Sequence, residues 1–133
     1  MREFHLQIVT PDGIVFDGDA EGILVRADEG DVEIMHGHTD YFATLATGRA
    51  KLTAGGEVKN ASASGGFISV KDGEVKLVTT TFEFASDIDL PRAEAAKARA
   101  EEAIRAAKDD KALIIAKAKL ARAISRINVA KLK

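Results

Sequence analysis

The chain has 133 residues, of which 46% are hydrophobic and 30% are charged, and its formal net charge is −2. This length suits one domain, or a compact domain with an appendage, and the apolar fraction is large enough to build a core. The absence of cysteine excludes disulfide frameworks and thiol-based redox or zinc chemistry. The sequence lacks a signal-like apolar block and any run near the roughly 18 apolar residues of a membrane span. We therefore expect a cytoplasmic protein that meets a membrane only through partners.

Residues 1–84 are predicted to form an antiparallel β-sandwich. Phe4, Leu6 and Ile8 alternate with polar residues, which places them on one face of a strand. Further short strand-like runs follow, separated by glycine- and proline-containing turns such as the hairpin signal at Lys71–Gly73. About eight to ten strands are expected at this spacing, which is typical of a sandwich or barrel. Since strands and helices do not alternate along this region, a parallel α/β sheet is disfavoured.

Three properties of the chain change near residue 85. All 11 glycines lie at or before Gly73, and the last aromatic residue is Phe84. Residues 88–133 hold 12 basic and 6 acidic groups, whereas residues 1–87 hold 7 basic and 15 acidic groups. We therefore predict two units, a sandwich over residues 1–84 and a basic helical hairpin over residues 85–133.

Asp89 marks the predicted start of the first helix. Its side chain is suited to capping the free backbone N–H groups, and Pro91 in the first turn lacks an N–H that would have no partner there. The helix is expected to continue to about Ala107. It carries a seam of small side chains at spacings of three and four: Ala93, Ala96, Ala100, Ala103 and Ala107. Such a seam allows a second helix to approach closely.

The second helix is predicted to follow a turn at residues 108–111. Its apolar stripe consists of Leu113, Ala116, Leu120, Ile124 and Ile127. An alanine seam buries little area, at roughly 25 cal/mol per Å². We therefore expect the hairpin to be marginally stable alone and its attachment to the sandwich to be easily altered.

The sequence contains no motif for catalysis. A phosphate loop and a nucleophile turn for a serine–histidine–acid set are both missing. His36 and His38 have no nearby third ligand, so we interpret them as ordinary loop residues and expect no metal site. The chain is therefore predicted to have no catalytic residues and not to be an enzyme itself.

Four arginines of the hairpin are candidates for anion binding: Arg92, Arg99, Arg122 and Arg126. On a helix, charges three or four residues apart are neighbours. The first two arginines have the acidic neighbours Asp89 and Glu102, whereas the last two face each other without one. If the hairpin folds so that the four guanidinium groups converge, they suit a polyphosphate, which arginine holds by forked hydrogen bonds. The alternative is that they form the solvated face of an amphipathic helix.

The order of these features resembles one known family. The sandwich region contains the stretches VTPDGIVFDGDAEGILVRADEGDVEIM and GGFISV, and the alanine-rich hairpin begins DIDLPRA and continues RAEAAKARAEEA. With these stretches in this order, the whole chain resembles the epsilon subunit of the bacterial and chloroplast F-type ATP synthase.

The resemblance implies a non-catalytic rotor subunit in the central stalk of the proton-translocating ATP synthase, on the cytoplasmic side of the bacterial plasma membrane. Its sandwich would bind the gamma subunit and the c-ring. Its hairpin would either fold against the sandwich or extend to the alpha and beta subunits of the catalytic head and inhibit ATP hydrolysis. The excess basic charge of the hairpin fits an acidic partner.

ATP is the regulatory ligand that the resemblance implies, and no cofactor is required. In several bacterial members the folded hairpin binds ATP without hydrolysing it, through a motif that this chain carries as Ile88, Asp89, Arg92 and Ala93. The other contacts that the resemblance implies are Glu83, Arg99, Arg122 and Arg126. ATP would then favour the folded hairpin over the extended one.

Two other classes of function compete with this interpretation, and features of the sequence argue against each. A stand-alone enzyme would need an acid–base or nucleophile set, which the chain lacks. A stand-alone anion- or nucleic-acid-binding module would use the basic hairpin. The hairpin has no aromatic residue to stack on bases, and the acidic sandwich would repel phosphates, so no nucleic acid is expected as a partner.

Overall fold

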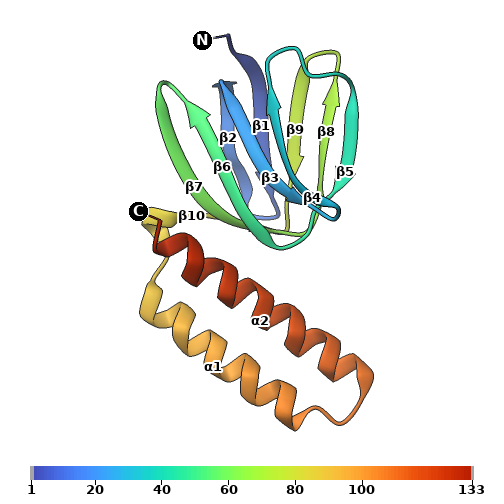
Figure 1. The fold of residues 1–133 in the computed structure, drawn as a ribbon, viewed down its shortest axis with the longest axis vertical. Coiled ribbons are helices and arrows are strands. Elements are labelled where there is room, and N and C mark those ends of the chain that lie inside the picture. Colours follow the sequence, from blue (N-terminus) through green and yellow to red (C-terminus); the bar gives the residue numbers. More distant parts are fainter. Residues whose placement is uncertain (1, 133) are drawn as a thin grey trace.

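The computed structural model describes residues 2–132 and shows a β-sandwich followed by two antiparallel helices (Figure 1). The predicted fold class is therefore confirmed. Ten strands lie within these residues: β1 (Phe4–Thr10), β2 (Gly13–Ala20), β3 (Gly22–Ala27), β4 (Gly30–Met35), β5 (Tyr41–Thr44), β6 (Gly48–Ala54), β7 (Glu57–Ser64), β8 (Phe67–Lys71), β9 (Glu74–Val78) and β10 (Thr81–Phe84).

The strands form two five-stranded sheets that pack face to face. The first sheet has the order β2-β1-β9-β8-β5 and the second has the order β10-β7-β6-β3-β4. Neighbouring strands are antiparallel except β1 and β9, which run parallel with Leu6 opposite Val75. The predicted antiparallel sandwich thus contains one parallel pair, because β1 occupies the free edge of the β8–β9 hairpin and runs in the direction of β9.

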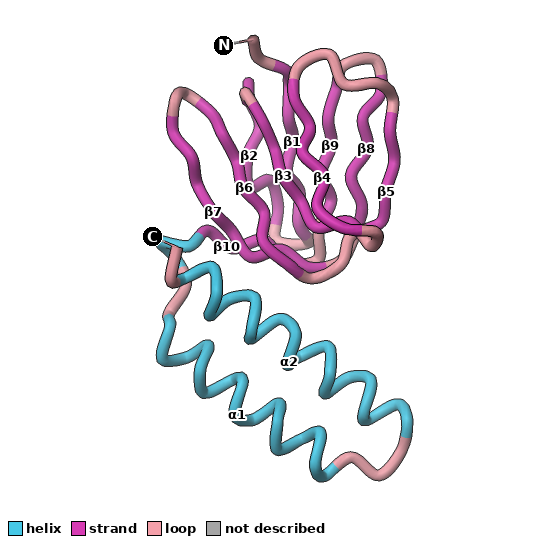
Figure 2. Tube along the Cα trace, in the orientation of Figure 1, coloured by secondary structure: helices cyan, strands magenta, loops and turns pink. Residues whose placement is uncertain are grey.

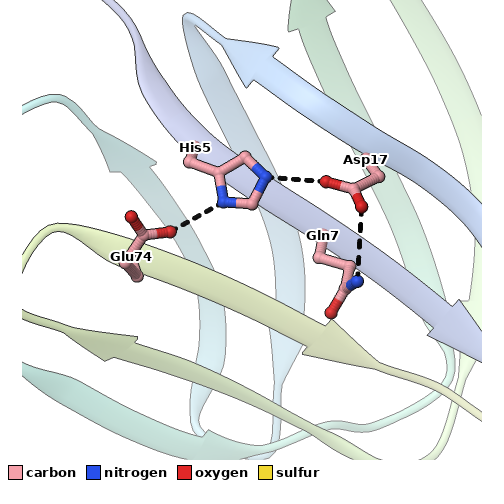
Figure 3. A network of polar contacts seen from close by, with 4 residues as sticks. All are labelled: His5, Gln7, Asp17 and Glu74. Carbon is pink, nitrogen blue, oxygen red and sulfur yellow. Dashed lines mark hydrogen bonds and ion pairs between the residues drawn. The ribbon is translucent and has the colours of Figure 1, made fainter.

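A side-chain network crosses this parallel pair on the outer face of the sheet (Figure 3). His5 of β1 lies 2.7 Å from Glu74 of β9 through Nδ1, and 2.6 Å from Asp17 of β2 through Nε2. Since ionised carboxylates only accept hydrogen bonds, the two contacts together favour the protonated imidazole, in which both ring nitrogens donate. The hydrogen bonds to Glu74 and then to Asp17 raise the pKa of His5 above its ordinary value of 6.5.

The main hydrophobic core lies between the two sheets. The face predicted for β1 is confirmed, since Phe4, Leu6 and Ile8 are at most 7% exposed. The largest almost completely buried apolar side chains of the sandwich come from both sheets: Leu6, Ile8, Ile23, Val25, Ile34, Ile68 and Leu77. At roughly 25 cal/mol per Å² of apolar surface, this burial is the main source of stability of the sandwich.

Two turns depend on residues that tolerate positive φ. The predicted hairpin between β8 and β9 is confirmed, with Asp72 at φ 51° and Gly73 at φ 81°. Positive φ at both central residues is what a two-residue type I′ turn requires. Gly66 has φ 86° and lies against the carbonyl oxygen of Val78, which a Cβ atom would strike. Glycine is therefore needed where the chain enters β8.

The C-terminal unit consists of a short 3-10 turn, η1 (Ala85–Asp87), and the helices α1 (Leu90–Ala106) and α2 (Asp110–Ala130). The bounds of α1 agree with the predicted first helix. The turn predicted at residues 108–111 is too long, because α2 begins at Asp110. The side chain of Asp109 caps α2 by accepting the backbone N–H of Ala112 at 2.7 Å.

The buried faces of the helices differ in part from the predicted stripes. On α1, Ala93 and Ala100 are buried as expected, whereas Ala103 is exposed. On α2, Ile124 was expected in the stripe but is 39% exposed. The buried residues of α2 are Ala116, Ala123, Ser125, Ile127, Val129 and Ala130. The reason is that α2 contacts α1 on one side and the sandwich on another, so its small side chains are covered from two directions.

The hairpin is folded against one end of the sandwich. α2 packs on β7, β6 and η1, whereas α1 packs mainly on α2 on the side away from the sheets (Figures 1 and 2). The hydroxyl groups of Ser62 on β7 and Ser125 on α2 form a buried hydrogen bond of 2.8 Å. Within residues 2–132, neither helix is long and apolar enough to cross a membrane.

Candidate functional site

The first turn of α1 is fixed by local interactions. Oδ1 of Asp89 accepts the backbone N–H of Arg92 at 3.1 Å, and Pro91 lies in the same turn. Ile88 and Ala93 are 4% and 0% exposed. They belong to an apolar cluster at the junction with the sandwich, together with Ala85, Ile127, Val129 and Ala130. The stretch from Ile88 to Ala93 therefore anchors α1.

A cavity of about 650 Å³ opens between the two helices and the sandwich. β7 contributes Ser62 to its wall, and β10 contributes Thr81 and Glu83. The helices contribute small apolar and cationic side chains: Ala96, Arg99, Ala100, Ala103, Lys119, Arg122, Ala123 and Arg126. Because the alanine side chains are short, the helices can lie close together and still leave this space open.

The cavity is positively charged. Four cationic side chains and one carboxylate line it, which leaves a formal excess of three positive charges. Nε of Arg126 donates to Oε1 of Glu83 at 2.8 Å, and these side chains are 25% and 34% exposed. None of the ion pairs within residues 2–132 includes Arg99, Lys119 or Arg122. These three charges are therefore available to an anion.

The ion pairs of two arginines differ from those that helical spacing alone suggests. Arg126 does have a carboxylate partner, but Glu83 comes from β10 and is not a helical neighbour. Arg99 was expected beside Glu102, yet Glu102 pairs with Arg105 at 2.7 Å. The partners differ because Arg99 turns toward the cavity, while Arg105 and Glu102 share the exposed side of α1.

The structure brings four of the eight predicted site residues to the cavity: Glu83, Arg99, Arg122 and Arg126. The other four do not line it. Ile88 and Ala93 are buried at the junction, Asp89 caps α1, and Arg92 is exposed. The expected convergence thus holds for three arginines and not for Arg92. Arg92 shares the helix face of Arg99, but a separation of seven residues places it about 10 Å away along the axis.

Sequence reasoning missed Lys119, which lines the same cavity. Lys119 precedes Arg122 by three residues and Arg126 by seven, so the three side chains lie on one face of α2. That spacing is the signal by which Lys119 can be found from sequence. The hydroxyl groups of Ser62 and Thr81 have no such signal, because they reach the cavity from strands of the other unit.

Two family models match this chain. The ATP synthase, Delta/Epsilon chain, beta-sandwich domain matches residues 3–85, and the corresponding long alpha-helix domain matches residues 86–131. The ATP synthase epsilon chain of Bacillus velezensis is 40% identical over 130 residues, which cover 98% of each chain. The ATP synthase epsilon chain of Ruminococcus albus is 36% identical over 131 residues, again with 98% of each chain covered.

Two solved structures contain a chain with a similar fold. One is the structure of the mitochondrial ATP synthase of Euglena gracilis (OSCP/F1/c-ring, rotational state 1). The similar chain in it has a TM-score of 0.79 and 24% identity, and the match covers 98% of this chain and 82% of that chain. The other is the structure of the central stalk and c-ring of the Tetrahymena thermophila mitochondrial ATP synthase. The similar chain in it has a TM-score of 0.69 and 14% identity, and the match covers 98% of this chain and 96% of that chain. At these identities the structures support the fold alone. From the family models and its full-length relatives, the chain belongs to the ATP synthase epsilon chain family.

Proposed function

We propose that this chain, a non-catalytic subunit of the ATP synthase complex, senses ATP in the cavity between its hairpin and its sandwich. The observation that carries the proposal is the excess positive charge of a cavity built jointly by β10, α1 and α2. A ligand in that cavity contacts both units at once. It therefore binds the folded arrangement in preference to an extended one and shifts the hairpin toward the folded state.

ATP fits the cavity in size and in charge. A volume of about 650 Å³ lies within the range of roughly 300–1,000 Å³ that small-molecule sites occupy. The guanidinium groups of Arg99 and Arg122 are suited to forked hydrogen bonds with phosphate oxygens. The methyl groups of Ala96, Ala100 and Ala123 offer an apolar wall for a flat ring.

The expected energy of ligand binding is large enough to control the hairpin. A ligand at 100 times its Kd stabilises the state that it binds by about 2.7 kcal/mol. The folded hairpin depends on small side chains and a few polar contacts, such as Ser62 with Ser125 and Glu83 with Arg126. A shift of this size is comparable to the free energy that we expect from such contacts.

We further propose that the sandwich holds the chain in the central stalk, where it contacts the gamma subunit and the c-ring. Membership of the ATP synthase epsilon chain family supports this placement, and the fold shared with chains of two ATP synthase assemblies that include a c-ring is consistent with it. The released hairpin would reach the alpha and beta subunits and inhibit ATP hydrolysis. The excess of basic groups in residues 88–133 supports an acidic target there.

Calorimetric titration of the full chain with ATP tests the sensor. We expect saturable one-to-one binding, which Arg122→Ala weakens by about tenfold or more because a charged phosphate contact is lost. Arg105→Ala is the matched control, because it removes the same charge from an exposed residue outside the cavity. Failure of the unaltered chain to bind millimolar ATP would overturn the sensor proposal and leave the arginines to contacts with other subunits.

Arg92→Ala, titrated in the same way, defines the extent of the site. The side chain of Arg92 is exposed and does not line the cavity, although the resemblance to the family includes it in the nucleotide motif. Loss of ATP binding in this variant would extend the site to the first turn of α1. Retained binding would confine the site to the residues that line the cavity.

A disulfide lock tests the regulatory role separately from binding. The chain has no cysteine, and the Oγ atoms of Ser62 and Ser125 are 2.8 Å apart, so Ser62→Cys combined with Ser125→Cys can hold α2 on β7. In the assembled ATP synthase, oxidation of this double variant should remove the inhibition of ATP hydrolysis, and reduction should restore it. Ser62→Cys alone is the control. Equal hydrolysis rates before and after reduction would contradict regulation through release of the hairpin.

A further inference from the structure

We infer that Lys119 contacts the terminal phosphate of the nucleotide and makes the cavity selective for a triphosphate over a diphosphate. This inference rests on the proposed function of the cavity as an ATP site. It adds a specificity-determining residue that neither the arginine pattern nor the family motif includes.

The position of Lys119 on α2 extends the row of cations away from the sandwich. Lys119, Arg122 and Arg126 are spaced three and four residues apart and all line the cavity. Seven residues of α-helix span about 10 Å, so the row has two distinct ends. Arg126 lies at the end next to β10, where it pairs with Glu83, and Lys119 lies at the end toward the tip of the hairpin.

Lys119 is free to bind an anion. Its side chain is exposed, and none of the ion pairs found within residues 2–132 includes it. Lys119 also lines a second cavity of about 500 Å³ near the tip of the hairpin, whose walls are mostly alanine. The carboxylate that lines this second cavity belongs to Asp109, and its Oδ1 accepts the backbone N–H of Ala112 at the start of α2. The ammonium group can therefore move toward a ligand without breaking an ion pair.

The charge distribution orients a bound nucleotide. Glu83 neutralises the charge of Arg126 at the sandwich end of the row, so this end attracts the phosphates of a nucleotide less strongly than the rest of the row does. The available cations are Arg99, Arg122 and Lys119, so the phosphate chain extends from the middle of the cavity toward Lys119. A triphosphate reaches the end of the row, whereas a diphosphate ends one phosphate earlier and leaves Lys119 without a contact.

The test is a comparison of ATP and ADP affinity in the full chain and in Lys119→Gln, measured by calorimetry. We expect the substitution to weaken ATP binding by about tenfold and ADP binding by less than about threefold. Lys119→Arg keeps the charge and should retain the preference for ATP. Lys117→Gln is the matched control, because it removes the same charge from an exposed residue on α2 that lines neither cavity.

The outcomes separate this inference from the proposal on which it rests. If the unaltered chain does not bind ATP, the proposed sensor fails and the inference fails with it. If the unaltered chain binds ATP but Lys119→Gln weakens ATP and ADP equally, or weakens neither, the sensor stands and the inference is overturned. An equal loss of ATP affinity in Lys117→Gln would also overturn it, because the effect would then come from overall charge.

Discussion

The sandwich and the helical hairpin are packed with different side chains. Branched aliphatic residues such as Leu6, Ile68 and Leu77 fill the sandwich and are completely buried. The hairpin is packed largely with alanine, and among residues 2–132 its largest almost completely buried side chain is Val129. Two cavities, of about 650 and 500 Å³, lie along the helices. The two units of one chain therefore differ in the apolar surface that each buries per residue.

This difference indicates a division between a scaffold and a movable element. Truncation of one large buried side chain to alanine costs about 2–5 kcal/mol, so the packed core holds the sandwich firmly folded. The contacts of α2 with the sandwich combine a small apolar cluster with one buried hydroxyl pair and one partly buried ion pair. Such contacts can be outweighed by a ligand or a protein partner, so the hairpin can change position while the sandwich stays folded.

Leu77→Ala has the largest expected effect and tests whether large buried side chains stabilise the sandwich. Leu77 is 0% exposed at the centre of the sandwich, and its truncation should lower the free energy of unfolding by about 2–5 kcal/mol. Urea denaturation followed by circular dichroism measures this change. The control is Ile114→Ala on α2, which is 67% exposed and should change stability by less than about 0.5 kcal/mol. Similar losses in both variants would remove the distinction between the two units.

Ser125→Ala tests the polar contact between α2 and the sandwich. The change leaves the hydroxyl group of Ser62 buried without its partner, which should cost about 1–3 kcal/mol of docking free energy. Hydrogen exchange of the α2 amides should become faster, while exchange in the sandwich core stays unchanged. The double variant Ser62→Ala with Ser125→Ala should lose less than the single one, because no unpaired hydroxyl remains. A double variant that loses the sum of both single effects would contradict this reading.

Asp89→Ala tests whether the start of α1 is a local structural feature. Loss of the cap on the N–H of Arg92 should destabilise the helix by about 1 kcal/mol. Hydrogen exchange over the first turn of α1 should therefore become faster in Asp89→Ala. Asp89→Ser should restore slow exchange, because serine also caps helices. Unchanged exchange in Asp89→Ala would show that packing of Ile88 and Ala93 fixes this turn without the cap.

The smallest expected effect concerns pH and the network around His5 (Figure 3). Hydrogen bonds to Glu74 and Asp17 raise the pKa of His5 above 6.5 in the folded state. The stabilising contribution is therefore complete below about pH 6.5 and is lost as the pH rises through the raised folded-state pKa. NMR titration of the imidazole should give a pKa above 6.5, and His5→Gln should abolish this part of the pH dependence of stability. A pKa at or below 6.5 would contradict the network.

Much of the fold is predictable from the sequence because it depends on interactions between residues that are close together in the chain. Period-two alternation identifies the buried face of β1, and the Asp72–Gly73 turn and the Asp89 cap identify where elements begin and end. The parallel pairing of β1 with β9 is not predictable in this way, since it depends on which sheet edge the N-terminal strand meets. Ile124 was misplaced for a similar reason, because its exposure depends on how α2 shares its surface between α1 and the sandwich.

The candidate site also combines features that local sequence patterns predict with features that only the packed structure shows. Helical spacing places Arg122 and Arg126 on one face, and the same spacing identifies Lys119 once all cations are considered. The ion pair of Arg126 with Glu83 joins residues 43 positions apart, so no local rule finds it. The exclusion of Arg92 from the cavity likewise depends on how far along α1 the cavity extends, which only the packed structure defines.

Hydrogen exchange of the full chain, measured by mass spectrometry with and without saturating ATP, tests the central claim most directly. A ligand held between the hairpin and the sandwich should slow exchange in α1 and α2 by about 100-fold at 100 times its Kd, while the amides of the sandwich core keep their rates. Arg122→Ala should abolish the slowing. Unchanged exchange in the helices, or equal slowing in both units, would contradict a nucleotide site that controls the hairpin.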